Sequence, residues 1–186
     1  MTAQLLRKKF TVSEFCKMAE TGIFSDEDNI ELIEGEIVEM GKIGRRHAAY
    51  CDRLNDLFRD KFAKQVLLRV QSPIELNNLS QPQPDLALLR RREDYYESGH
   101  PQPHDIFLLV EVADTTIDSD REIKIPLYGK NGILETWLID INAQCLEVYR
   151  DPSSQGYQST QKLRRGQSIA SLIFPTIAIE VNEIMG

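Results

Sequence analysis

The stretch F-L-L-V-E-V-A-D, from Phe107 to Asp114, places a carboxylate inside an apolar run. A continuous apolar run of this length is typical of a strand that is buried on both faces of a sheet. A carboxylate in such a strand loses its hydration, which is costly unless a partner compensates. Glu111 therefore needs a cation or hydrogen-bond donors nearby, and it is the first candidate for a functional residue.

Length and composition indicate a single folded domain. The 186 residues are 41% hydrophobic and 27% charged, which favours a globular fold over a disordered chain. Because no apolar segment reaches membrane-spanning length and the N-terminus lacks the apolar core of a signal peptide, no membrane association is expected. The three cysteines have no metal-ligand spacing and are too few for a disulfide framework. We therefore expect a cytoplasmic location.

The formal net charge of −7 limits the kinds of partner. It argues against bulk electrostatic attraction to nucleic acid, because neutralising phosphates requires lysine and arginine. It leaves room for a local basic surface. It equally fits a site crowded with acids that becomes neutral only when a cation binds.

Hydrophobic periodicity and turn residues predict a mixed α/β (α+β) fold with a central sheet. A capping box over Thr11–Glu14 opens a first helix that Gly22 ends, and two short strands flank the hairpin turn Glu34–Gly35. The remaining expected elements are amphipathic helices over 46–62 and 118–130 and strands over 66–76, 85–89, 106–112, 134–141, 145–150, 156–163 and 177–181.

The helix over 118–130 carries two conflicting signals. Ser119–Glu122 has the pattern of a capping box, which would start the helix there. Pro126 removes a backbone donor and crowds the preceding turn. We therefore expect a kink or a late start in this helix.

Two carboxylates enter consecutive core strands, Asp85 at the start of one and Glu111 near the end of the next. Adjacent strands lie about 4.8 Å apart, so acids at the same level could share one divalent cation. Such an ion would offset the desolvation of Glu111 and its repulsion with Asp85. Lys124, on the following helix, could orient or deprotonate a metal-bound water, or stabilise a pentacoordinate phosphate. This set indicates metal-assisted phosphodiester hydrolysis.

The motifs P-D-L-A-L-L (84–89) and L-L-V-E-V-A (108–113) resemble the PD-(D/E)XK nuclease superfamily, and more closely its Uma-two branch of restriction-endonuclease-like proteins. Support comes from I-E-L-I-E-G-E-I-V-E-M (30–40), from His47 at a helix start, and from K-x-x-x-Y-x-x-x-G-I-x-E-x-W (124–137). The single motifs are weak, but their order across residues 10–179 is specific. The resemblance implies a restriction-endonuclease-like core of a central mixed sheet flanked by helices, divalent-metal binding and a DNA substrate.

We expect one restriction-endonuclease-like domain over 1–186, divided into an N-terminal helix and β-hairpin extension (10–43), a catalytic core (44–141) and C-terminal strands (142–186). The chain departs from the superfamily signature at one point. The signature has a lysine two residues after the glutamate, and Ala113 stands there. We interpret Lys124 as a relocated lysine whose side chain reaches back to the site.

Further candidates each have an ordinary alternative. Glu36 is a possible extra metal ligand or water-holding group, although hairpin acids mostly face solvent. His47 could contact the scissile phosphate or be a surface histidine. Tyr128 lies one turn beyond Lys124 and could pack in the core or hydrogen-bond to the site. The candidates for DNA contact, which could equally be solvated, are Arg45, Arg46, Arg90 and Arg91.

The sequence thus predicts a magnesium-dependent DNA endonuclease, with Mn²⁺ as a possible substitute ion. Asp85 and Glu111 are the expected metal ligands, and Lys124 completes the catalytic set. A homodimer is expected, because cutting two strands calls for two sites. Two alternatives stay open: a weakly active or inactive nuclease-fold module that binds nucleic acid, and an oligomeric interaction protein.

Overall fold

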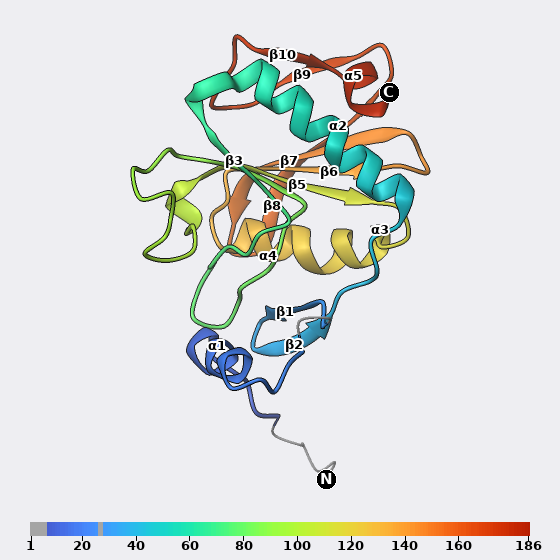
Figure 1. Cartoon of the computed structure of the whole chain (residues 1–186). Helices are drawn as coiled ribbons and strands as arrows, with labels where there is room; N and C mark the ends of the chain where they lie inside the picture. Colours follow the sequence, from blue (N-terminus) through green and yellow to red (C-terminus); the bar gives the residue numbers. More distant parts are fainter. Residues whose placement is uncertain (1–6, 26–27) are drawn as a thin grey trace.

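The computed structural model describes residues 7–25 and 28–186, which form a six-stranded mixed sheet with helices on both faces (Figure 1). The strand order is β3-β4-β5-β6-β7-β8, and neighbours are antiparallel except β5 and β6, which are parallel. The predicted mixed α/β fold is therefore confirmed. The strands are β3 (Leu67–Val70), β4 (Leu86–Leu89), β5 (Ile106–Ala113), β6 (Glu135–Asp140), β7 (Cys145–Ser153) and β8 (Gly156–Arg164).

Helix α2 (Arg45–Phe62) covers one face of the sheet, and a broken helix covers the other (Figure 1). Alternate β5 side chains separate the two layers. Leu108 packs in the same cluster as Phe58 of α2, whereas Leu109 packs with Tyr128 of the opposite layer. Glu111 follows the alternation of Leu109 and so faces the broken helix. That helix consists of α3 (Ile117–Ser119), the π-helical turn η3 (Asp120–Lys124) and α4 (Ile125–Lys130).

The irregularity expected near Pro126 is observed as this π-helical turn. The N–H of Ile125 donates to the carbonyl of Asp120, five residues back. Pro126, the next residue, has no N–H to donate. The capping box predicted at Ser119 is wrong, because α3 already begins at Ile117 and the Ser119 hydroxyl donates to the Thr116 carbonyl.

The N-terminal elements are α1 (Val12–Glu20) and the hairpin of β1 (Ile30–Ile33) and β2 (Glu36–Glu39). The predicted capping box at Thr11 is present. Leu32 is fully buried and packs in one cluster with Val12 and Phe15. The hairpin lies on the α4 side of the sheet, and residues 40–44 connect it to α2 across the sheet end (Figure 1).

The C-terminal elements are β9 (Ser168–Ala170), β10 (Ala178–Glu180) and α5 (Val181–Met185), and α5 lies against α2 (Figure 1). Glu135 of β6 is fully buried and accepts hydrogen bonds from Trp137, Arg150, Ser171 and the backbone N–H of Leu172. This carboxylate ties the central sheet to the chain after β9. Its role in the E-x-W motif is therefore structural.

The strand predicted over 66–76 ends at Val70, because Gln71 takes a positive φ of 45° and Pro73 follows. Short 3₁₀ turns complete the fold at η1 (Ala63–Gln65) and η2 (Pro103–Asp105). Among the described residues, no helix combines the length and apolarity needed to cross a membrane.

Candidate active site

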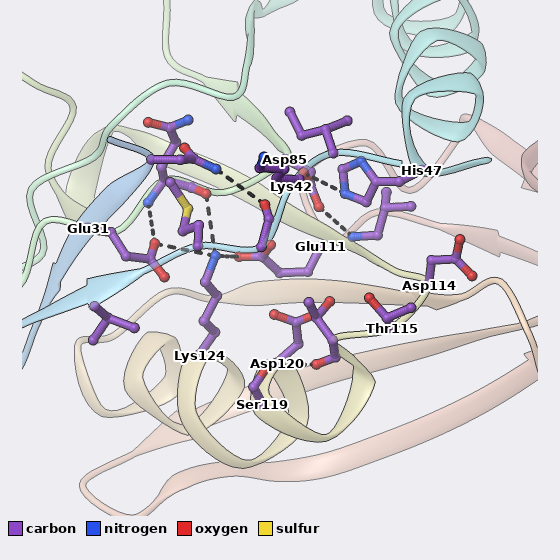
Figure 2. A pocket seen from close by; sticks show the side chains of 18 of the residues that line it. Glu31, Lys42, His47, Asp85, Glu111, Asp114, Thr115, Ser119, Asp120 and Lys124 are labelled. Carbon is purple, nitrogen blue, oxygen red and sulfur yellow. Dashed lines mark hydrogen bonds and ion pairs between the residues drawn. The ribbon is translucent and has the colours of Figure 1, made fainter. Parts of the chain in front are cut away.

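A cavity of about 380 Å³ lies between the N-terminal hairpin, the start of α2 and η3. It opens at the sheet end where β4 begins and β5 ends. Figure 2 shows the acidic and basic side chains that converge there. They come from β1, β4, β5 and η3, segments far apart in sequence, and include Glu31, Asp85, Glu111, Asp120 and Lys124.

Asp85 and Glu111 stand at the same level of the sheet. Leu86 pairs with Val110 in the antiparallel β4–β5 ladder, and the two acids are each the next residue outward. Asp85 Oδ2 accepts a hydrogen bond from the N–H of Val112 at 2.8 Å, which fixes this carboxylate on the neighbouring strand. Glu111 Oε1 accepts a hydrogen bond from the Tyr128 hydroxyl. The sheet register therefore holds both carboxylates at the cavity.

The side chain of Lys124 extends from η3 to Glu111 and Glu31. Its Nζ lies 3.6 Å from Glu111 Oε1 and 3.4 Å from Glu31 Oε2. It also donates to the Gln83 carbonyl at 3.4 Å. Ala113, where the superfamily signature has lysine, is fully buried in a cluster with Ile125 and other apolar residues. The α4 layer fills that place, and η3 brings an ammonium group to the cavity instead.

Electrostatics in the cavity favour an additional cation. Burial raises the pKa of Glu111 well above its usual range, and Lys124 offsets this only in part. Burial likewise raises the pKa of Asp120. Burial alone would lower the pKa of Lys124, but attraction by Glu111 and Glu31 outweighs it and raises the pKa. One ammonium group thus faces more carboxylates than it can neutralise.

His47 is coupled to Asp85 rather than directed at solvent. Its Nε2 lies 3.0 Å from Asp85 Oδ1, and this hydrogen bond raises the pKa of His47. Cys51, one turn further along α2, has its Sγ 3.7 Å from His47 Nδ1. Burial raises the pKa of the Cys51 thiol, which disfavours the thiolate form.

The donor set fits a hard divalent ion held by two carboxylates. Among the described residues, one group of three potential metal ligands has its ligand atoms within 4.8 Å of one another, namely His47, Cys51 and Asp85. No group of three carboxylates in the described residues is that compact. Mg²⁺ usually binds through one or two carboxylates and keeps several waters. Asp85 and Glu111 supply that number, and within the described residues no hydrogen bond reaches Glu111 Oε2.

The remaining predicted candidates do not line the cavity: three lie away from it and two lie beside it. Glu36 is exposed and pairs with Lys9 at 2.9 Å. It lies on the same face of the hairpin as Glu31 but directly after the turn, and it does not line the cavity. Arg90 and Arg91 follow the far end of β4, where Arg91 donates to the Val66 carbonyl. Arg45 and Arg46 begin α2 beside the cavity, and Arg46 pairs with Asp114 at 2.9 Å.

Two buried cavity acids were not predicted from the sequence. Glu31 is buried, and its Oε2 accepts a hydrogen bond from the N–H of Gln83 at 3.0 Å. Its signal was the one that identified Glu111: an acid between apolar, strand-forming neighbours. Asp120 is buried and accepts a hydrogen bond from the Thr116 hydroxyl at 2.6 Å. The i, i+4 spacing of these two residues was its only local signal.

Comparisons with known proteins identify a family and a similar fold. Residues 12–182 match the model of the Uma2 family, described as "Putative restriction endonuclease". The fold is similar to a crystal structure titled as a putative nuclease belonging to DUF820 from Anabaena variabilis, with a TM-score of 0.71 and 18% sequence identity. The similarity covers 95% of this chain and 97% of that one. No curated protein gives a significant sequence match.

Proposed function

Because the chain belongs to the Uma2 family, we propose that it is a divalent-metal-dependent endonuclease that hydrolyses phosphodiester bonds in DNA. The observation that carries the proposal is the convergence of Asp85, Glu111 and Lys124 on one cavity. Structural ion pairs can also gather buried acids around a lysine. Here, however, the acids outnumber the lysine at the open end of a sheet, an arrangement better explained by a bound cation and a phosphate.

In this proposal Asp85 and Glu111 would hold Mg²⁺, with Mn²⁺ as a possible substitute, and Glu31 lines the same cavity. The ion supplies a Lewis acid for the phosphoryl oxygens and lowers the pKa of an attacking water. Hydrolysis joins the water oxygen to phosphorus and breaks one phosphorus–oxygen ester bond, and the departing oxygen gains a proton. Lys124 stabilises the negative charge that develops on the phosphate.

The neighbouring residues have supporting roles. Tyr128 donates to Glu111 Oε1, and Oε2 would remain available to hold the ion. His47 fixes Asp85 Oδ1 through the contact at 3.0 Å. Arg45 and Arg46 are the candidates for phosphate contact on the flanking strand. Since cleavage of both strands of a duplex needs two sites, a homodimer is part of this proposal for duplex substrates.

The test measures cleavage of single-stranded and duplex DNA by the full chain with Mg²⁺, Mn²⁺ or EDTA. Asp85→Asn and Glu111→Gln preserve shape while removing charge, and each is expected to abolish cleavage. Glu36→Gln is the matched control, because Glu36 is an exposed acid outside the cavity. Thermal unfolding of each variant checks that the fold survives.

Several outcomes would contradict the proposal. Full activity of both cavity variants, or cleavage that persists in EDTA, would exclude the assigned metal site. DNA binding without metal-dependent cleavage would identify an inactive nuclease-fold module. Absence of both DNA binding and DNA cleavage would favour the alternative that the chain is an oligomeric interaction protein.

A further inference from the structure

We propose that the cavity receives an unpaired nucleic-acid strand rather than an intact duplex. This inference rests on the proposed nuclease function and specifies its substrate class. It is carried by three features of the described residues: the depth of the reactive groups, the chain that crosses over them, and the apolar side chains at the cavity mouth.

The reactive groups lie too deep for a phosphate on a duplex surface. Glu111 is 2% exposed, and the Asp85 and Lys124 side chains are each 13% exposed. A phosphate therefore has to move into the cavity of about 380 Å³ to meet them. Pockets of roughly 300 to 1,000 Å³ enclose a small organic ligand, so this one has room for about one nucleotide and not for a double helix.

The connection from the hairpin to α2 forms one wall of the cavity. Residues 40–44 run from β2 on the α4 side to the start of α2 on the other side, past the end of the sheet (Figure 1). A rigid double helix laid across Asp85 and Glu111 would collide with this connection. A flexible single strand can bend around it, because its backbone is not held in a stiff helix.

The exposed lining of the cavity includes three large apolar side chains beside polar ones, whereas duplex-binding surfaces are basic. Val38, Ile43 and Ile123 line the cavity and are 38%, 53% and 50% exposed. Unpaired bases present the apolar faces that a duplex hides by stacking, and proteins that bind single strands contact those faces. Within the cavity lining, the lysines are Lys42 and Lys124, too few for the many phosphate contacts on which duplex binding depends.

The experiment measures binding by fluorescence anisotropy, using the full chain and Ca²⁺ as a hard ion in place of Mg²⁺. The probes are a labelled single-stranded oligonucleotide and a hairpin duplex containing the same sequence. The single strand should bind at least about tenfold more tightly, and Ile43→Ser or Ile123→Ser should each weaken it by about tenfold, the effect of losing one base contact. Leu134→Ser is the matched control, because Leu134 is 48% exposed and does not line the cavity.

Equal or tighter binding of the duplex would overturn the inference, as would no binding of either probe or unchanged binding by both mouth variants. Cleavage is measured separately with Mg²⁺ or Mn²⁺ to keep the two proposals distinguishable. Preferential single-strand binding without cleavage supports the inference and contradicts the nuclease. Metal-dependent cleavage of duplex and single strand at equal rates supports the nuclease and contradicts the inference.

Discussion

Among the single residues of the cavity, Lys124 carries the positive charge that lies closest to Glu111 and Glu31. It lies between Glu111 and Glu31, with Nζ–oxygen distances of 3.6 and 3.4 Å. Because both acids raise its pKa, the group stays charged throughout the pH range in which the protein would work. A permanently charged donor suits stabilisation of a phosphate, whereas a general base would have to lose its proton.

Lys124→Met should reduce metal-dependent cleavage by roughly 10²- to 10³-fold, the usual loss when one charge-stabilising donor is removed. Ca²⁺ binding should be retained or become tighter, because a positive charge next to the ligands disappears. Single-turnover cleavage and isothermal titration with Ca²⁺ measure the two effects. Lys130→Met on α4 is the control, since Lys130 is exposed and does not line the cavity. Unchanged cleavage by Lys124→Met would remove this lysine from the proposed mechanism.

Local sequence could identify acids in apolar strands, but not which end of the N-terminal hairpin would lie at the cavity. Glu111, Asp85 and Lys124 were expected to meet, and their side chains line one cavity. Glu36 was chosen from the hairpin, and Glu31 is the hairpin acid that lies at the cavity. Both lie in short amphipathic strands, and only the docking of the hairpin against the loop before β4 distinguishes them.

At the scale of elements, the π-helical turn η3 connects the cavity to the far strands of the sheet. Its Lys124 faces the cavity, while its Arg121 pairs with Glu147 of β7 at 3.0 Å. Lys162 of β8 reaches the same carboxylate oxygen at 3.0 Å. The turn that precedes Pro126 is thereby fastened to β7 through Arg121, which helps to keep Lys124 in position.

Glu147→Gln is expected to loosen this attachment in a pH-dependent way. Burial raises the pKa of Glu147, but hydrogen bonds from Arg121, Tyr149 and Lys162 outweigh it and lower the pKa to about 2. Because the pKa is lowered, the ionised carboxylate stabilises the folded state fully at pH values above its ordinary pKa of 4.5. This stabilisation is lost as the pH falls through the lowered pKa of about 2. The loss at neutral pH should be about 1 kcal/mol, because the basic partners are partly solvent-screened.

The measurement is the free energy of unfolding in denaturant as a function of pH. Wild type and Glu147→Gln should differ at neutral pH and converge as the pH falls through about 2, below which both side chains are uncharged. Glu122→Gln is the control on η3, because Glu122 is exposed and forms no ion pair within the described residues. A difference that stays constant with pH would show that packing, not charge, carries the effect.

The same elements show what periodicity can predict. Helix α2 and strands β4 to β7 follow strong apolar patterns, and they were expected close to their observed positions. Strand β8 has a weaker pattern and was also expected there. Strand β9 is a three-residue segment, Ser168–Ala170, which is too short for any period to be visible. It exists because β10 pairs with it and because the Ser171 hydroxyl donates to Glu135, contacts that only the folded chain brings together.

At the scale of the whole molecule, the net charge of −7 restricts how nucleic acid can be held. The basic residues at the start of α2 lie beside the cavity, whereas Arg90 and Arg91 follow the far end of β4. Binding should therefore depend on few phosphate contacts and on base contacts at the mouth. A monomer would suffice for a single-stranded substrate, whereas the homodimer expected from the sequence is needed only if both strands of a duplex are cut.

The salt dependence of single-strand binding tests this distribution of charge. Each neutralised phosphate of a single strand contributes a slope of about −0.7 to log affinity against log salt, so two or three contacts should give a slope between about −1.4 and −2.1. Arg45→Ala and Arg46→Ala should each make the slope shallower by about 0.7, and Arg90→Ala should leave it unchanged. Anisotropy titrations over a NaCl series at fixed Ca²⁺ measure these slopes. A much steeper slope would mean that cations remote from the cavity also contact the nucleic acid. An effect of Arg90→Ala equal to that of Arg45→Ala would place the bound single strand along the far end of β4.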